Sequence, residues 1–172
     1  MAANRRDYLM RNRAASAGRR SSSHGESQPA DDKEHTMTAP AANNADNANA
    51  ALTDLADRYL AAWNETDAGR RRDLIGRTWT ESAVYVDPLM RGEGHAGIDA
   101  MIAGVQARFP GFQFRRVTPV DAHGEHLRFT WELGPDGDAA LVVGTDFATV
   151  SADGRLKGMT GFIDRAPAGL AG

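Results

Sequence analysis

The sequence contains no cysteine among its 172 residues, which excludes disulfide bonds and thiolate metal sites. It also lacks any apolar run approaching the roughly 18 residues that a membrane helix needs. The formal net charge is only −3, too balanced to indicate nucleic acid or a membrane surface as a partner. With 41% hydrophobic and 25% charged residues, the chain has the composition of an ordinary globular protein, which we expect in the cytoplasm.

Aliphatic side chains are almost missing from residues 1–50, where Leu9, Met10 and Met37 are nearly the only ones. Such a segment cannot bury enough apolar surface to offset its ordering entropy, so we predict a disordered tail. Its opening resembles a twin-arginine export signal, but a polar stretch stands where that signal needs an apolar one. A second interpretation is that residues 1–36 are a mis-called extension and that Met37 is the true start.

Apolar residues recur at helical spacing in three later segments. In the first segment the stripe comprises Leu52, Leu55, Tyr59, Leu60 and Trp63. In the second segment Leu74, Ile75 and Trp79 face inward, and the arginines at 70–72 are interpreted as a solvated face. The third segment, 97–109, turns Ile98, Met101, Ile102 and Val105 inward, after a glycine-bearing loop whose spacing does not fit a phosphate-binding loop.

Strand patterns occupy most of the remaining chain. A short strand is predicted at 83–86, where Pro88 follows and cannot continue a ladder. From Phe112 onward we predict a meander of four strands, with alternating residues at 126–133 and further strands at 140–150 and 156–164. Helices on one face of an antiparallel sheet define an α+β domain, which we place at 51–165 with a flexible C-terminus at 166–172.

This order resembles the NTF2-like superfamily and its SnoaL-like domains. The resemblance implies a cone, also called a cystatin-like α+β roll, in which three N-terminal helices pack on a strongly curved antiparallel sheet around a pocket. Three segments resemble the ketosteroid isomerase branch: residues 58–64, 83–88 and 145–147. At the matching positions that branch has a catalytic tyrosine, a base aspartate followed by proline, and a second, protonated aspartate.

The resemblance implies catalytic roles for Asp87, Tyr59 and Asp146. Asp87 is the expected base, while Tyr59 and a neutral Asp146 are the expected donors to an enolate oxygen. Asp146 must then be buried among apolar side chains, because desolvation favours the neutral carboxyl. Each residue also has a structural interpretation: Asp87 as a loop cap, Tyr59 as a core residue, and Asp146 as an acceptor of backbone amides. Arg128 departs from the isomerase pattern, and its pairing with Asp146 would remove this mechanism.

A small, largely apolar ligand is the expected partner, held by aromatic and sulfur side chains. The candidate substrate-binding residues are Trp63, Trp79, Met101, Phe114, Phe129, Trp131 and Phe162. His95, His123 and His126 lack metal-ligand spacing, so we expect no metal and no cofactor. A homodimer is expected across the sheet, through Arg115, His126, Arg128 and Thr130.

Two classes of function remain open. The first is a cofactor-free enzyme using acid/base chemistry on a steroid-, polyketide- or terpenoid-like carbonyl compound, as an isomerase or cyclase, or alternatively as an epoxide hydrolase or dehydratase. The second is a non-catalytic ligand-binding or assembly module on the same scaffold. The fold by itself cannot decide between them, because one scaffold hosts many functions.

Overall fold

The computed structural model describes residues 40–170, with side chains described from residue 47 onward. The predictions about residues 1–39, including the start at Met37, lie outside this range. The helices are α1 (Pro40–Asn64), α2 (Ala68–Thr78) and α3 (Gly94–Arg108). The strands are β1 (Trp79–Val86), β2 (Arg91–Glu93), β3 (Phe112–Arg116), β4 (Asp121–His123), β5 (His126–Pro135), β6 (Val142–Val150) and β7 (Leu156–Arg165).

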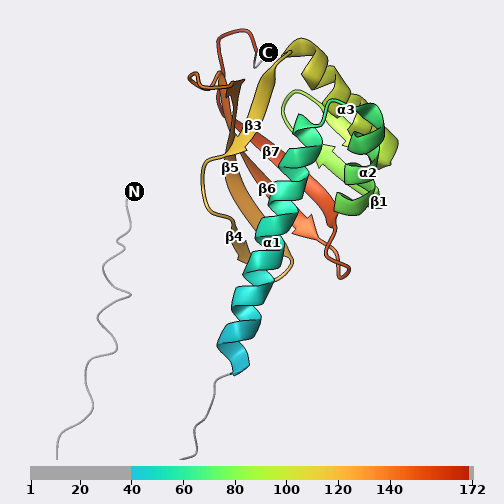
Figure 1. Ribbon diagram of the computed structural model, residues 1–172, viewed down its shortest axis with the longest axis vertical. Coiled ribbons are helices and arrows are strands. Elements are labelled where there is room, and N and C mark those ends of the chain that lie inside the picture. Colours follow the sequence, from blue (N-terminus) through green and yellow to red (C-terminus); the bar gives the residue numbers. More distant parts are fainter. Residues whose placement is uncertain (1–39, 171–172) are drawn as a thin grey trace, which may run out of the picture. The chain divides into compact units, whose positions relative to one another are not determined.

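The strands form one sheet in the order β2-β1-β7-β6-β5-β3, with β4 also paired to β5. Figure 1 shows the three helices gathered on one side of this sheet. The α+β class is therefore confirmed, but the prediction of an antiparallel sheet is wrong at one place. Strands β1 and β7 pair in parallel, which makes the sheet mixed. The parallel pair joins the first and last strands of the chain, and helix α3 lies in the long connection that such a pair requires.

Three element boundaries differ from those expected. Helix α1 begins at Pro40, so residues 40–50 are helical where composition favours a disordered tail. Trp79 is the first residue of β1 rather than part of a helix, although it is fully buried as expected. Residues 91–93, predicted as loop, form β2 against β1.

The first strand of the predicted meander is divided into β3 and β4, which lie one after the other along β5. Pro119 lies in the break between them and lacks the N–H that a continuous ladder needs. In this break a side chain supplies a hydrogen bond to β5 in place of backbone, since the Thr130 amide donates to Thr118 Oγ1 at 2.9 Å. The remaining strands, β5, β6 and β7, agree with the predicted ranges to within about two residues, the usual uncertainty of element ends.

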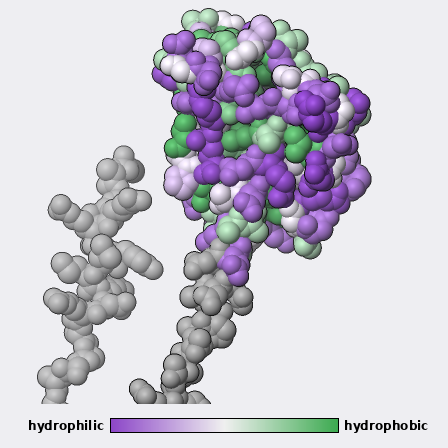
Figure 2. Space-filling view, in the orientation of Figure 1, coloured by the Kyte–Doolittle hydropathy of each residue, from purple (hydrophilic) through white to green (hydrophobic). Residues whose placement is uncertain are grey.

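The alternation predicted for β5 is confirmed, because Leu127, Phe129, Trp131 and Leu133 are all buried. These side chains pack against the apolar stripe of α1, so the inner face of the sheet and α1 form the core. Figure 2 shows a largely hydrophilic surface on the side drawn, as amphipathic elements with inward apolar faces produce. Within residues 40–170, no helix is long and apolar enough to cross a membrane.

Arg71 corrects the interpretation of residues 70–72 as a solvated face. Its side chain is buried and donates from Nε to Asp99 Oδ1 at 2.6 Å. It also donates to the Gln106 side chain at 3.2 Å and to the Glu65 carbonyl at 3.3 Å. Arg71 therefore joins the C-terminal end of α1 to α2 and α3, while Arg70 and Arg72 are exposed.

Candidate functional site

A cavity with almost wholly apolar walls lies between helices α1 and α3 and the inner face of the sheet. It contains about 490 Å³ of atom-free space, counting the space at its open end. The cavity is lined by Tyr59, Leu60, Trp63, Tyr85, Asp87, Leu89, Met90, Val105, Phe109, Phe114, Trp131, Leu133, Val142, Ile163 and Leu170.

The Tyr59 hydroxyl donates a hydrogen bond to Asp146 Oδ2 at 2.6 Å. Tyr59 lies on the buried stripe of α1 and Asp146 on the inner face of β6, and Asp146 is 0% exposed. The second carboxyl oxygen, Asp146 Oδ1, is buried without a hydrogen-bond partner among the residues that the structure describes. Arg128 pairs instead with Asp121, at 2.9 Å on the surface. Asp146 is thus a buried carboxyl with one donor and no arginine partner within residues 40–170.

Burial raises the pKa of Asp146 from 3.8 to about 6, and the nearby charge of Asp87 acts in the same direction. The Tyr59 hydroxyl and the neighbouring Trp131 indole oppose this rise by favouring the carboxylate. Burial, followed by the charge on Asp146, raises the pKa of Tyr59 well above its ordinary value. Tyr59 consequently keeps its proton at all physiological pH values, while Asp146 changes its charge close to neutrality.

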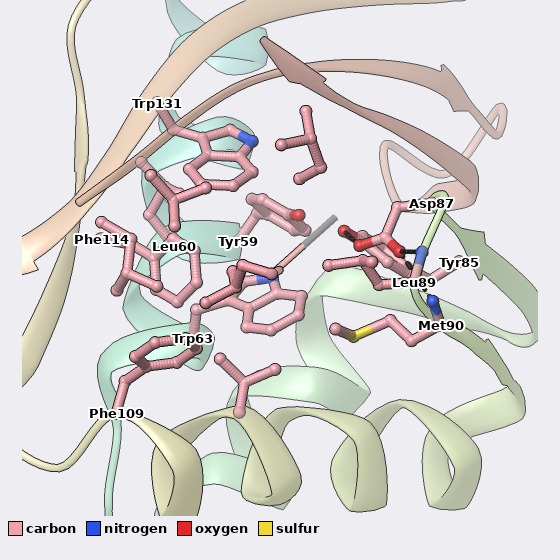
Figure 3. Close-up of a pocket in the computed structure, with 15 residues that line it drawn as sticks. Tyr59, Leu60, Trp63, Tyr85, Asp87, Leu89, Met90, Phe109, Phe114 and Trp131 are labelled. Carbon is pink, nitrogen blue, oxygen red and sulfur yellow. Dashed lines mark hydrogen bonds between the residues drawn. The ribbon is translucent and has the colours of Figure 1, made fainter. Parts of the chain in front are cut away.

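Asp87 lies just after β1 and has both a structural and a cavity-facing role. Its Oδ1 accepts the backbone amides of Leu89 at 2.7 Å and Met90 at 2.8 Å, which caps the turn at Pro88. Its Oδ2 accepts the Tyr85 hydroxyl at 2.9 Å. In Figure 3 the Tyr59 hydroxyl and the Asp87 carboxylate face each other from opposite walls of the cavity.

Gly161 leaves room for these polar groups to meet. It lies opposite Asp146 in the pairing of β6 with β7. A Cβ at this position would lie 3.0 Å from the Tyr85 hydroxyl, 3.1 Å from Asp146 Oδ1 and 3.1 Å from Asp87 Cβ. Groups from β1 and β6 therefore surround one point near Gly161. Tyr59 and Asp87 line the cavity, whereas Asp146 is fully buried next to them and is not among the lining residues.

The candidate substrate-binding residues separate into two groups. Trp63, Phe114 and Trp131 line the cavity, whereas Trp79 and Phe129 pack behind Tyr59 with ring centroids at 5.7 and 5.8 Å from its ring. The other two candidates lie outside. Met101 borders a groove along α3 that adjoins the cavity, and Phe162 is 53% exposed on the outer face of β7.

Sequence reasoning did not identify Tyr85 as a site residue. The sequence nevertheless contains an indication of this role. Tyr85 lies two positions before Asp87 at the end of a strand, and residues two apart in extended chain share a face. Leu89 and Met90 also line the cavity without having been predicted as site residues, as does Leu170, which lies in the segment predicted to be a flexible C-terminus. Leu170 nevertheless packs against the core, and its amide bonds the Pro167 carbonyl at 3.1 Å. No periodic pattern of apolar residues in the segment 166–172 predicts this contact.

No three histidine, aspartate or glutamate side chains gather in a metal-binding arrangement within the described part of the chain. The polar groups of the lining side chains are one carboxyl, two phenols and two indole N–H groups, and the buried Asp146 carboxyl is bonded to one of the phenols. The arrangement can therefore hold a ligand oxygen and exchange protons with an otherwise apolar molecule.

Comparison with solved structures agrees with this fold. The chain is 42% identical to a protein from Agrobacterium tumefaciens provisionally named an isomerase of the SnoaL-like family; the match covers 67% of this chain and 99% of that one, with a TM-score of 0.65. A protein from Jannaschia sp., provisionally named a SnoaL-like polyketide cyclase, is 20% identical over 67% of this chain and 86% of its own, with a TM-score of 0.55. At that identity the second likeness concerns the fold alone. A search of curated proteins gave no match.

The three helices and the mixed sheet, together with the similarity to a SnoaL-like structure, define the class as NTF2-like. The family model of the SnoaL-like domain matches residues 56–159, so the chain belongs to the SnoaL-like family. This confirms the resemblance drawn from the sequence. The strong curvature of the sheet stays a prediction.

Proposed function

We propose that this protein is a cofactor-independent isomerase or cyclase that moves protons beside the carbonyl group of a largely apolar substrate. The observation that carries the proposal is the buried, arginine-free Asp146 bonded to Tyr59, whose side chain lines the same cavity as Asp87. The relative from A. tumefaciens, provisionally named an isomerase, supports the same reaction class.

In the proposed reaction, Asp87 removes a proton from the carbon beside the carbonyl. The C–H bond breaks, an O–H bond forms on Asp87, and the electron pair moves to give an enolate with its charge on oxygen. The neutral Asp146 carboxyl donates to that oxygen, while Tyr59 holds Asp146 in place. Asp87 then returns the proton to a different carbon of the conjugated system, so that atoms and charge balance.

The pKa of Asp146 near 6 sets a pH requirement for this mechanism. An ionised carboxylate cannot donate a hydrogen bond, so the donor form is lost as the pH rises through about 6. At substrate concentrations well below saturation, where the free protein titrates, turnover should accordingly fall by at least about tenfold between pH 5.5 and pH 8.

The experiment is the conversion of β,γ-unsaturated ketones into conjugated enones, followed by ultraviolet absorption, with wild type and Asp87→Asn. Asparagine keeps the shape and an acceptor for Leu89 and Met90 but is not a base. We expect the variant to lose about 10²–10⁴ in turnover, the usual contribution of a positioned base. Glu93→Gln, which changes an exposed carboxylate outside the cavity, is the control and should keep full activity.

Equal turnover of wild type and Asp87→Asn would contradict the proposal. A non-catalytic ligand-binding module is the second candidate, and one observation favours it. Asp87 accepts three hydrogen bonds, two of them from backbone amides, as a purely structural cap also does. Ligand binding without turnover, unchanged by Asp87→Asn, would support this second function. The homodimer and the cytoplasmic location stay predictions.

A further inference from the structure

Three buried polar atoms lie near the Tyr59–Asp146 pair without a hydrogen-bond partner among residues 40–170. They are Asp146 Oδ1, Trp63 Nε1 and Trp131 Nε1. Buried polar groups in folded proteins nearly always find partners, so each exception calls for an explanation. Trp63 and Trp131 line the cavity and are 4% and 5% exposed, which places their N–H groups beside the ligand space and away from bulk water.

Trp131 is held in its position by the sheet. It lies directly opposite Gly144 in the pairing of β5 with β6. A Cβ on Gly144 would lie 2.4 Å from Cζ2 and 2.8 Å from Cε2 of the indole, so the ring lies flat over the glycine. Gly144 and Asp146 are two residues apart and face the same side of β6, which makes Trp131 and Asp146 diagonal neighbours on the inner face of the sheet.

The orientation of the indole agrees with a role toward the ligand. In Figure 3 the nitrogen of Trp131 faces the part of the cavity where the Tyr59 hydroxyl and Asp87 lie. Phe109 and Phe114 occupy the opposite part, so polar atoms gather at one end and hydrocarbon at the other. The cavity thus suits a molecule with one oxygen-bearing end and an apolar body.

We infer that the Trp131 indole N–H, on the cavity wall next to the buried Asp146 carboxyl, is a further donor to the ligand oxygen. This inference rests on the proposed function, because it takes from it the kind of ligand, a ketone. It does not require that the protein converts that ligand into a product. An indole N–H donates at every pH. It would bind the carbonyl of the free ketone even where Asp146 is ionised, and it would add a second bond to the enolate oxygen.

The chain suits a direct test because it has three tryptophans, Trp63, Trp79 and Trp131. All three indole N–H groups are buried and unpartnered within the described range, but Trp79 does not line the cavity. Trp79→Phe is therefore a matched control for Trp131→Phe. The ligands form a matched pair as well: 2-tetralone carries a ketone, and tetralin is the same bicyclic hydrocarbon without oxygen.

The first measurement is the affinity of each variant for the two ligands. We expect Trp131→Phe to weaken 2-tetralone about 3- to 10-fold, as the loss of one hydrogen bond does, and to leave tetralin within about twofold. Trp79→Phe should leave the ratio of the two affinities unchanged. If Trp131→Phe lowers both affinities equally, or neither, the indole acts only through packing and the inference is overturned.

The second measurement uses the wild-type protein, so that it does not depend on how a variant folds. In a ¹H–¹⁵N spectrum the indole proton of Trp131 should move downfield when 2-tetralone is added and much less with tetralin. The Trp79 signal should not respond to the oxygen. A downfield shift confined to Trp63, or none at all, would contradict the inference. Both measurements record ligand binding and not turnover. Their outcome therefore does not depend on whether Asp87→Asn loses activity in the turnover assay.

Discussion

Two buried ionisable side chains of this domain, Arg71 and Asp146, differ in how completely they are paired with hydrogen-bond partners. Arg71, between the helices, has Asp99, Gln106 and the Glu65 carbonyl as partners. Asp146, at the cavity, has one hydroxyl donor and an oxygen without a partner within residues 40–170. A fully paired charge fixes the geometry of its surroundings, whereas a poorly paired one has a displaced pKa and is ready to bind or exchange a proton. The comparison separates a structural ion pair from a candidate functional carboxyl.

The largest effect on stability should come from breaking the paired site. Arg71→Leu leaves Asp99 with a side chain only 18% exposed and without its main partner. Removing one member of such a pair typically costs about 3–5 kcal/mol. Chemical denaturation measures this loss, and the matched control is Arg72→Leu, whose side chain is 62% exposed and 3.9 Å from the same Asp99. We expect the control to cost less than about 1 kcal/mol. Similar costs for both variants would show that Arg71 is no more structural than its exposed neighbour.

Replacing Asp146 should increase the stability of the protein at high pH, because the pKa of Asp146 in the folded state lies above the ordinary value of 3.8. The folded protein then binds more protons than the unfolded chain between pH 4 and 6, so its stability decreases as pH rises through that window. A pKa near 6 corresponds to roughly 3 kcal/mol lost by pH 8. Asp146→Asn removes this loss, because asparagine carries no titratable proton in this pH range. The amide oxygen of the asparagine can still accept the hydrogen bond from the Tyr59 hydroxyl.

We therefore expect Asp146→Asn to be about 2–3 kcal/mol more stable than wild type at pH 8 and nearly equal to it at pH 4. Denaturant titrations at both pH values provide the measurement. Asp121→Asn, at an exposed ion pair with Arg128, serves as the control and should change stability by less than about 1 kcal/mol. A destabilised Asp146→Asn at pH 8 would mean that the ionised carboxylate is required by the fold.

The sequence predicted much of this arrangement through local periodicity. The apolar stripe of α1 placed Tyr59 inward, and alternation in β6 placed Asp146 beside Val142, Gly144 and Ala148 on the buried face. Both inferences depend only on the repeat of a helix or a strand. The resemblance to a known family then added the chain order in which Tyr59, Asp87 and Asp146 occur.

What the sequence could not predict depends on contacts between distant segments. The parallel pairing of β1 with β7 brings Tyr85 and Asp87 to Gly161, which lies opposite Asp146, and nothing local to these residues indicates it. Arg71 looks like its exposed neighbours, and only the position of α3 makes it buried. The same limit applies to Trp131, whose orientation follows from a glycine on the adjacent strand.

The most direct test of the account is the titration of the Asp146 carboxyl, followed by ¹³C NMR with Asp146→Asn used to assign its signal. The account predicts a midpoint near pH 6 in the free protein, where burial outweighs the Tyr59 hydrogen bond. It also predicts a higher midpoint when 2-tetralone is bound, because the ketone oxygen accepts a hydrogen bond only from the neutral acid. A midpoint at or below the ordinary 3.8, unchanged by the ketone, would contradict the account and leave Asp146 a structural carboxylate.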